Sequence, residues 1–226
     1  MHRLNGIAAV TFDVGGTLLA PQPSVGAVYA RVAARHGHPD CSPGTLDRRF
    51  REAWQRSGGS FHQSRSNWER LVDEVFAGLV DPPPSQSFFP QLYAEFARPT
   101  AWHIFEDVIP TLEALAGRGL DLGVISNWDE RLRPLLKALR LDRYFASITV
   151  SCEAGFAKPS PVIFEEALRS LGQPAAAVLH VGDSLIDDFA GATGAGLAAL
   201  HLRRDAPSAD RQIRTLLDLP IRLGDG

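Results

Sequence analysis

Short apolar runs and helical hydrophobic spacing alternate along most of the chain. The apolar runs are typical of strands that are buried on both faces of a sheet. Between them, apolar residues recur every three or four positions, as they do on one face of a helix. Such alternation predicts an α/β fold in which a doubly wound parallel sheet is covered by helices on both faces. The expected strands are 7–12, 120–126, 148–151, 178–181 and 197–200, and the expected helices are 109–116, 132–139, 163–171, 189–195 and 211–219.

One long stretch in the N-terminal half departs from this alternation. It has helical spacing throughout, in amphipathic segments that begin near Ser24, Thr45, Ser66 and Phe89. Short connections between such helices are typical of a small bundle. We therefore expect two domains: an α/β core domain formed by residues 1–21 and 99–226, and an inserted all-helical domain formed by residues 22–98.

Composition and charge narrow the functional classes. The chain has 226 residues, of which 45% are hydrophobic and 22% are charged, and its formal net charge is −3. This balance fits a globular enzyme or binding protein and lacks the basic footprint of a nucleic-acid-binding protein. The sequence has no apolar stretch long enough to span a bilayer and no signal-peptide pattern, so we expect no membrane association and a cytoplasmic location. Cys41 and Cys152 do not form a disulfide framework, and nothing in the sequence indicates a protein partner.

Polar residues stand where the predicted strands end. Asp13 follows the first strand, Ser126 closes the second, and Asp183 follows the fourth. Lys158, one of only two lysines in the chain, lies in the loop after the third strand. Because the carboxyl ends of parallel strands meet at one edge of a sheet, we expect these side chains to converge in one crevice.

The residue types in this set indicate phosphoryl chemistry. Two neighbouring carboxylates, Asp13 and Asp183, repel each other, and a divalent cation between them removes that cost. Mg²⁺ suits such an oxygen-only site, because it keeps water and substrate phosphate oxygens among its ligands. Asp13 is then placed to attack a phosphorus atom as a covalent nucleophile, while Ser126 and Lys158 hold the transferring oxygens.

The motifs, taken in order, resemble those of the haloacid dehalogenase superfamily of hydrolases. The resemblance rests on FDVGGTLL, VISN, AKPSPVIF and VGDSLIDDFAGATGAG, which contain Asp13, Ser126, Lys158 and Asp183. It covers essentially the whole core and implies a Rossmann-like domain with a helical cap inserted after the first motif. The region around Trp102, the ISNWD motif and the length of the insert resemble one branch of this superfamily. That branch has no well-defined substrate, so this resemblance implies none for this chain.

The resemblance implies a metal-assisted nucleophile. Asp13 would be both the nucleophile and a Mg²⁺ ligand. The backbone carbonyl of Gly15 and the side chain of Asp183 would complete the protein ligands. A further acid supports such sites in the superfamily; Asp188 fits that position best and Asp187 is next in line.

The resemblance also implies a phosphate-binding set and a small phosphorylated molecule as substrate. Gly16 and Thr17 would position the loop and the phosphate. Ser126 and Asn127 would bind the phosphate, and Lys158 would neutralise its charge.

One position departs from the pattern of the superfamily's phosphatases. They carry a second aspartate two positions after the nucleophile, which protonates the leaving oxygen and activates water, whereas this chain has Gly15. A positioned general acid or base contributes about 10²–10⁴-fold to a rate. A phosphoryl hydrolase built on this site is therefore expected to be weak, to prefer good leaving groups, or to take an acid from the cap.

Three other interpretations stay open at this point. Phosphonatases also lack this acid, but they need a cap lysine, and both lysines, Lys137 and Lys158, lie outside the insert. The 2-haloacid dehalogenases lack it as well, but their fourth motif does not build an acidic metal site. A non-catalytic phosphate-binding or scaffold protein would keep the metal site without turnover.

Overall fold

The computed structural model describes residues 4–57 and 63–224. The chain divides into two compact units: a core unit made of Met1–Leu19 and Ile104–Gly226, and a second unit made of Ala20–His103. The second unit contains the stretch 22–98 that sequence spacing marks as a helical insert, and it extends a few residues beyond that stretch at each end. Each unit is described separately below.

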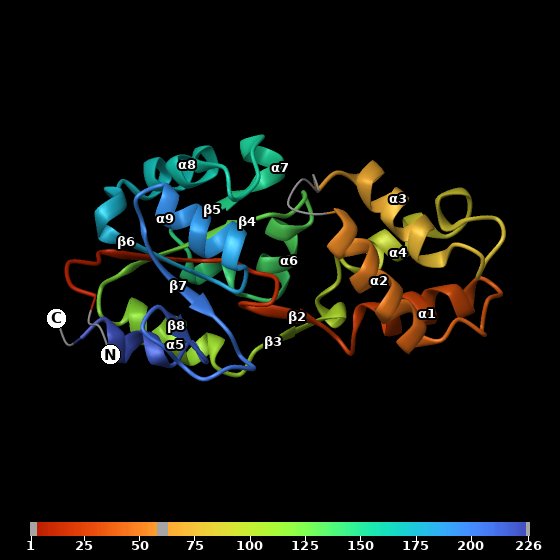
Figure 1. Ribbon diagram of the computed structural model, residues 1–226, viewed down its shortest axis with the longest axis horizontal. Coiled ribbons are helices and arrows are strands. Elements are labelled where there is room, and N and C mark those ends of the chain that lie inside the picture. The colour runs from red at the N-terminus through yellow and green to blue at the C-terminus, as the bar shows by residue number, and fades with distance from the viewer. Residues whose placement is uncertain (1–3, 58–62, 225–226) are drawn as a thin grey trace. The chain divides into compact units, whose positions relative to one another are not determined.

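The core unit is built on a parallel sheet of six strands in the order β5-β4-β1-β6-β7-β8 (Figure 1). This confirms the predicted doubly wound α/β fold. The central strand β1 is buried along its whole length, which explains its mostly apolar sequence. The strands are β1 (Ala9–Phe12), β4 (Asp121–Ser126), β5 (Ser147–Val150), β6 (Val178–Gly182), β7 (Ala198–Leu202) and β8 (Gln212–Ile213).

Helices pack on this sheet, and α8 (Pro161–Leu171) shows why they form where they do. The Ser160 hydroxyl accepts a hydrogen bond from the Val162 N–H, Pro161 occupies the first turn, and Gly172 ends the helix with φ +64°. The apolar face of α8 packs with strand residues in one buried cluster that includes Ile163, Phe164, Ala9, Ile125 and Val178. The other described helices of the core are α5 (Val108–Ala116), α6 (Leu132–Ala138), α7 (Ser151–Ala154), α9 (Gly191–Gly194) and α10 (Asp218–Arg222).

The strand register places the candidate residues at one edge of the sheet. Phe12 on β1 is paired with Val124 on β4 and with Val181 on β6. Asp13, the next residue, therefore emerges beside the ends of β4 and β6. Ser126 is the last residue of β4, and Asp183 directly follows β6. Neighbouring carboxyl ends of parallel strands form the crevice in which such sheets bind ligands.

The second unit is a helical bundle with an aromatic core. Its described helices are α1 (Val25–Arg35), α2 (Pro43–Ser57), α3 (Arg65–Phe76) and α4 (Phe89–Glu95). The ring of Tyr29 on α1 contacts Phe50, Phe76 and Phe96, with ring centroids 5.7–6.1 Å apart. These aromatic side chains stabilise the bundle interior. The connections to the core unit pair as a short ladder of β2 (Leu19–Pro21) and β3 (Trp102–Ile104).

Two segments near the C-terminus differ from the sequence-based expectation. The helix expected at 211–219 is instead the edge strand β8, followed by a shorter helix, α10. The helix expected at 189–195 begins earlier, as a π-helical turn at Leu185–Ala190, before α9. Within the described residues, the structure contains no helix with the length and apolar character needed to cross a membrane.

Candidate active site

Asp13 lies at the centre of the candidate site, at the end of β1. Its side chain is buried, and two donors converge on Oδ1: the Lys158 ammonium at 2.7 Å and the Ser126 hydroxyl at 3.0 Å. Burial raises the pKa of Asp13 above its ordinary value, the charge of Lys158 opposes that rise, and the charge of Asp188 adds to it. The carboxylate is thus held in place, and the neighbouring groups of the protein compensate its negative charge only in part.

Lys158 is a buried cation with a complete set of acceptors. Its Nζ donates to Asp13 Oδ1 at 2.7 Å, to Asp188 Oδ1 at 2.5 Å and to the carbonyl of Ile125 at 2.8 Å. Burial alone would lower the pKa of Lys158, but the carboxylates of Asp13 and Asp188 outweigh burial and raise it. Lys158 is therefore a fixed positive charge at neutral pH, and neutralisation of a bound phosphate by Lys158 stays a prediction.

Asp188 is the second counter-ion of Lys158. Its Oδ1 accepts from Lys158 and from the His180 ring at 3.1 Å, and its Oδ2 accepts from the Ser184 backbone N–H at 2.9 Å. Burial would raise its pKa, but Lys158 and His180 outweigh burial and lower it. Asp187 lies beside it, half-buried, and its Oδ1 has no hydrogen-bond partner among the described residues.

His180 is a participant that the sequence analysis did not select. Its position on β6 is directly paired with Thr11 on β1, and the Thr11 hydroxyl lies 2.9 Å from Nδ1. Burial lowers the pKa of His180, so the ring is neutral. The neutral ring that suits both contacts carries its proton on Nε2, donates to Asp188 and accepts from Thr11. A polar residue inside an otherwise apolar strand was the available signal, but its partner depends on register, which the sequence does not specify.

Asn127 lies next to Ser126 but directs its amide elsewhere. Its Nδ2 donates to the backbone carbonyl of Lys158 at 3.0 Å, and its Oδ1 accepts from the Lys158 N–H at 2.7 Å. This two-point contact ties the end of β4 to the loop that carries Lys158. Its observed contacts therefore position the lysine, and phosphate binding by Asn127 remains a prediction.

The loop after Asp13 contains Gly15 and Gly16, and the structure requires glycine only at position 16. Gly16 has φ +80°, and a Cβ there would lie 2.3 Å from Asp183 Oδ2, so both backbone conformation and space demand glycine. Gly15 is not in the left-handed region, and a Cβ there would meet only the ring of Trp128, at 3.4 Å. Thr17 follows, with its side chain buried and its carbonyl accepting from Arg204 at 2.8 Å.

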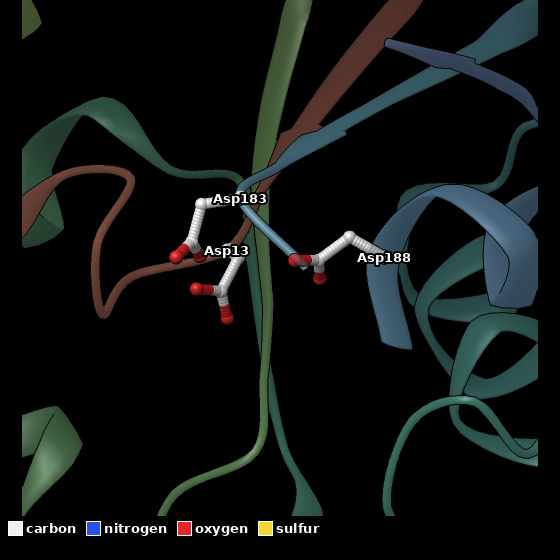
Figure 2. A group of neighbouring side chains, drawn as sticks. All are labelled: Asp13, Asp183 and Asp188. Atoms are coloured by element: carbon white, nitrogen blue, oxygen red, sulfur yellow. The ribbon is translucent and has the colours of Figure 1, made fainter. Parts of the chain in front are cut away.

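Three carboxylates of the core meet at this edge of the sheet. Asp13, Asp183 and Asp188 each offer an oxygen within 4.8 Å of the others, and Figure 2 shows Asp188 approaching from the helical segment while Asp13 and Asp183 extend from adjacent strand ends. Partial removal from water and the charges of Asp13 and Asp188 raise the pKa of Asp183 to about 7. The ligand atoms that these residues offer are all oxygens, and their negative charge exceeds the positive charge nearby. The side chain of Asp183 packs so closely against Gly16 that a Cβ on residue 16 would not fit. The residues therefore fit a hard divalent cation such as Mg²⁺.

Sequence comparison identifies the family. The model of haloacid dehalogenase-like hydrolases matches residues 7–196. The chain belongs to this hydrolase family. Human haloacid dehalogenase-like hydrolase domain-containing protein 3 is 35% identical over 206 residues, which are 87% of this chain and 81% of the human protein. The glyceraldehyde 3-phosphate phosphatase of Methanopyrus kandleri is 30% identical over 210 residues, 88% of this chain and 84% of that enzyme.

Solved structures of the family match both units of the chain. A haloacid dehalogenase-family phosphatase from Thermococcus onnurineus has a TM-score of 0.70 and 28% identity, covering 97% of this chain and 99% of that one. A 2-haloacid dehalogenase from Pseudomonas syringae has a TM-score of 0.65 and 32% identity, covering 96% and 98%. A hydrolase from Bacillus subtilis, solved bound to magnesium, has a TM-score of 0.75 and covers 99% of each chain, but its 21% identity shows the shared fold alone.

Proposed function

We propose that this chain is a Mg²⁺-dependent phosphoryl hydrolase that acts on a small phosphorylated molecule through an aspartyl-phosphate on Asp13. One observation carries the proposal: a buried lysine and a serine hydroxyl converge on Asp13 Oδ1 beside a second carboxylate, Asp183. A nucleophilic carboxylate needs positive charge and hydrogen-bond donors around the phosphoryl group that it attacks. Relatives with phosphatase names support the same reaction class.

Each side chain of the site has a separate role in this reaction. Asp13 attacks phosphorus, and the donors on Ser126 and Lys158 hold the phosphoryl oxygens as their negative charge is redistributed. Asp188, fixed by Ser184 and His180, holds Lys158 in position. Asp13, the Gly15 carbonyl and Asp183 would hold Mg²⁺, which when bound supplies Lewis-acid stabilisation of a phosphoryl oxygen.

Gly15 limits which esters such a site hydrolyses. A carboxyl group at this position would be the general acid for the leaving oxygen, and glycine supplies none. We infer that the enzyme hydrolyses substrates whose leaving groups are stable as anions far better than alkyl phosphates.

Dehalogenation is the second candidate, favoured by one observation. The Pseudomonas syringae 2-haloacid dehalogenase is 32% identical over nearly the whole chain. In that reaction Asp13 would displace a halide from carbon, with no cation required. The clustered carboxylates of Asp13, Asp183 and Asp188 favour the phosphoryl reaction instead, because their mutual repulsion is relieved by a cation.

A paired assay tests the proposal. We expect the purified protein to hydrolyse p-nitrophenyl phosphate in Mg²⁺, to lose that activity in EDTA, and to release no chloride from 2-chloropropionate. Asp13→Asn should abolish turnover while keeping the fold, since asparagine has the same shape and is a poor nucleophile. Chloride release without Mg²⁺ would favour the dehalogenase, and vanadate binding without any turnover would favour a non-catalytic phosphate-binding protein.

A further inference from the structure

His201 lies on β7, the strand next to β6, and Asp183 directly follows β6. In the sheet register His201 is paired with Gly182 on one side and with Gln212 of β8 on the other. Its Nε2 lies 3.0 Å from the backbone carbonyl oxygen of Asp183. A carbonyl oxygen only accepts hydrogen bonds, so the ring donates and Nε2 carries a proton. His201 thus binds the backbone of a residue whose carboxylate belongs to the acidic cluster.

The hydrogen bond from His201 is one of two that hold the same peptide group. The carbonyl of Asp183 and the N–H of Ser184 belong to one planar unit and point in opposite directions. His201 donates to that carbonyl, while the Ser184 N–H donates to Asp188 Oδ2 at 2.9 Å. Because a planar unit that is held at both edges cannot turn freely, these two bonds fix the backbone torsion ψ of Asp183.

This double contact opposes a movement that electrostatic repulsion favours. Asp183 is the exposed member of the three acids, and the charges of Asp13 and Asp188 repel it. Figure 2 shows its carboxylate beside that of Asp13, and on one side it packs against Gly16. With a free backbone, the carboxylate of Asp183 would turn toward water and leave the cluster. His201 therefore helps to keep this carboxylate where a cation would meet it.

We propose that His201 is a positioning residue for the metal site: by holding the peptide group after Asp183, it sets the affinity for Mg²⁺ and the preference for Mg²⁺ over Ca²⁺. This proposal rests on the proposed function and deepens it by naming a residue that tunes the metal site. Mg²⁺ requires nearly ideal octahedral coordination, whereas Ca²⁺ accepts flexible coordination. Loss of the His201 hydrogen bond should therefore weaken Mg²⁺ binding more than Ca²⁺ binding.

Calorimetric titration of the metal-free protein with MgCl₂ and with CaCl₂, without substrate and at a temperature where all variants are folded, tests the proposal. We expect His201→Leu to weaken Mg²⁺ binding about three- to tenfold, the size of one neutral hydrogen bond. Ca²⁺ binding should weaken by less than about twofold. His201→Gln should restore most of the Mg²⁺ affinity, because its amide places a donor near the position of Nε2.

Gln212→Leu is the matched control. It removes a side-chain hydrogen bond to a backbone carbonyl, that of Pro207, from the position on β8 that is paired with His201. This variant should bind both cations as the natural protein does. A second readout uses p-nitrophenyl phosphate: His201→Leu should need more Mg²⁺ for its half-maximal rate, by the factor found in the titration. At saturating Mg²⁺ it should reach nearly the natural kcat, because His201 does not contact the reacting atoms.

The outcomes separate this proposal from the proposed function. Unchanged Mg²⁺ affinity in His201→Leu would overturn the positioning role, and so would an equal loss for Mg²⁺ and Ca²⁺ or an equal loss in Gln212→Leu. Each of these results would leave the proposed function intact, because the natural protein would still bind Mg²⁺. A natural protein that binds no Mg²⁺ would overturn the proposed function, and the positioning role with it.

Discussion

His180 shows how a single buried side chain can act on a reaction that it does not touch. It joins Thr11 on β1 to Asp188, and Asp188 in turn fixes Lys158 against Asp13. Four of these five side chains are at most 2% exposed, so little water competes for their hydrogen bonds. His180 is thus a positioning residue for Lys158.

We expect His180→Leu to weaken vanadate binding by about tenfold, because a hydrogen bond to a charged group contributes about 1.5–3 kcal/mol. His180→Gln should restore most of the affinity, since its amide keeps a donor for Asp188. Isothermal titration with vanadate at a temperature where all variants are folded provides the measurement. Phe164→Leu is the packing control, because the Phe164 ring meets the His180 ring edge-on at 5.5 Å. An equal loss of vanadate affinity in Phe164→Leu and in His180→Leu would show that His180 acts only through packing.

Lys158 and Asn127 mark where residue-level reasoning from the sequence succeeds and where it stops. The scarcity of lysine and the loop position of Lys158 were enough to identify it as the cation beside Asp13. The amide of Asn127 could not be oriented, because its partners are backbone atoms 31 residues away. Motifs place residue types at strand ends, whereas hydrogen-bond directions depend on how the loops pack.

At the scale of elements, the strength of the hydrophobic signal decided what could be predicted. The strands β1, β4, β5, β6 and β7 are mostly apolar, so sequence spacing located them closely. The edge strand β8 has two residues, too few to show the alternation of apolar and polar residues that is typical of a strand. The segment 211–219 was therefore predicted to be a helix. The turn at 185–190 was missed because exposed apolar residues there, Leu185 and Ile186, follow no helical face.

One ion pair joins elements that are distant in the sequence. Arg204, after β7, donates to both oxygens of Asp107 before α5, at 2.8 and 3.1 Å, and also to the Thr17 carbonyl in the loop after β1. The Thr215 hydroxyl and the Leu216 N–H donate to the same carboxylate. The C-terminal segment is thereby tied to the loop that begins with Asp13.

This cluster predicts a pH-dependent contribution to stability. Burial would raise the pKa of Asp107, but hydrogen bonds from Arg204, Leu216 and Thr215 and the charge of Arg204 outweigh burial and lower it. A carboxyl group whose pKa is lowered on folding stabilises the protein above its ordinary pKa, 3.8, and this contribution is lost as pH falls through the folded value. We expect Asp107→Asn to reduce the free energy of unfolding by about 1–3 kcal/mol at pH 7.

Denaturant unfolding at several pH values tests this account. The difference between the natural protein and Asp107→Asn should be constant at neutral pH and shrink as the solution becomes more acidic than the ordinary pKa of aspartate. Other acids, such as Glu95 in the second unit, titrate equally in both proteins and cancel in the comparison. A difference that persists unchanged in strong acid would mean that the charge of Asp107 contributes nothing.

At the scale of the whole molecule, the candidate site is a place where folding stability and function oppose each other. The fold brings Asp13, Asp183 and Asp188 together, and their repulsion acts against the core unit that creates it. The Lys158 ammonium donates hydrogen bonds to Asp13 and Asp188 and so offsets their negative charge directly. It acts on Asp183 only through longer-range electrostatic attraction. Asp183 therefore destabilises the core unit unless a cation is bound, and a protein without a metal function would gain by losing it.

We therefore expect Asp183→Asn to have opposite effects with and without metal. In EDTA the substitution should raise the melting temperature, because it removes one of the repelling charges. In Mg²⁺ the natural protein should be stabilised by RT ln(1 + [Mg²⁺]/Kd), about 2.7 kcal/mol at a hundredfold excess over Kd, and Asp183→Asn should lose most of that gain. Scanning calorimetry follows both units, and only the transition of the core unit should respond. Asp205→Asn, which changes an exposed acid of the same unit, should leave the Mg²⁺ response intact. If Asp183→Asn were destabilising in EDTA and still fully responsive to Mg²⁺, Asp183 would be a structural residue and the cation would bind elsewhere.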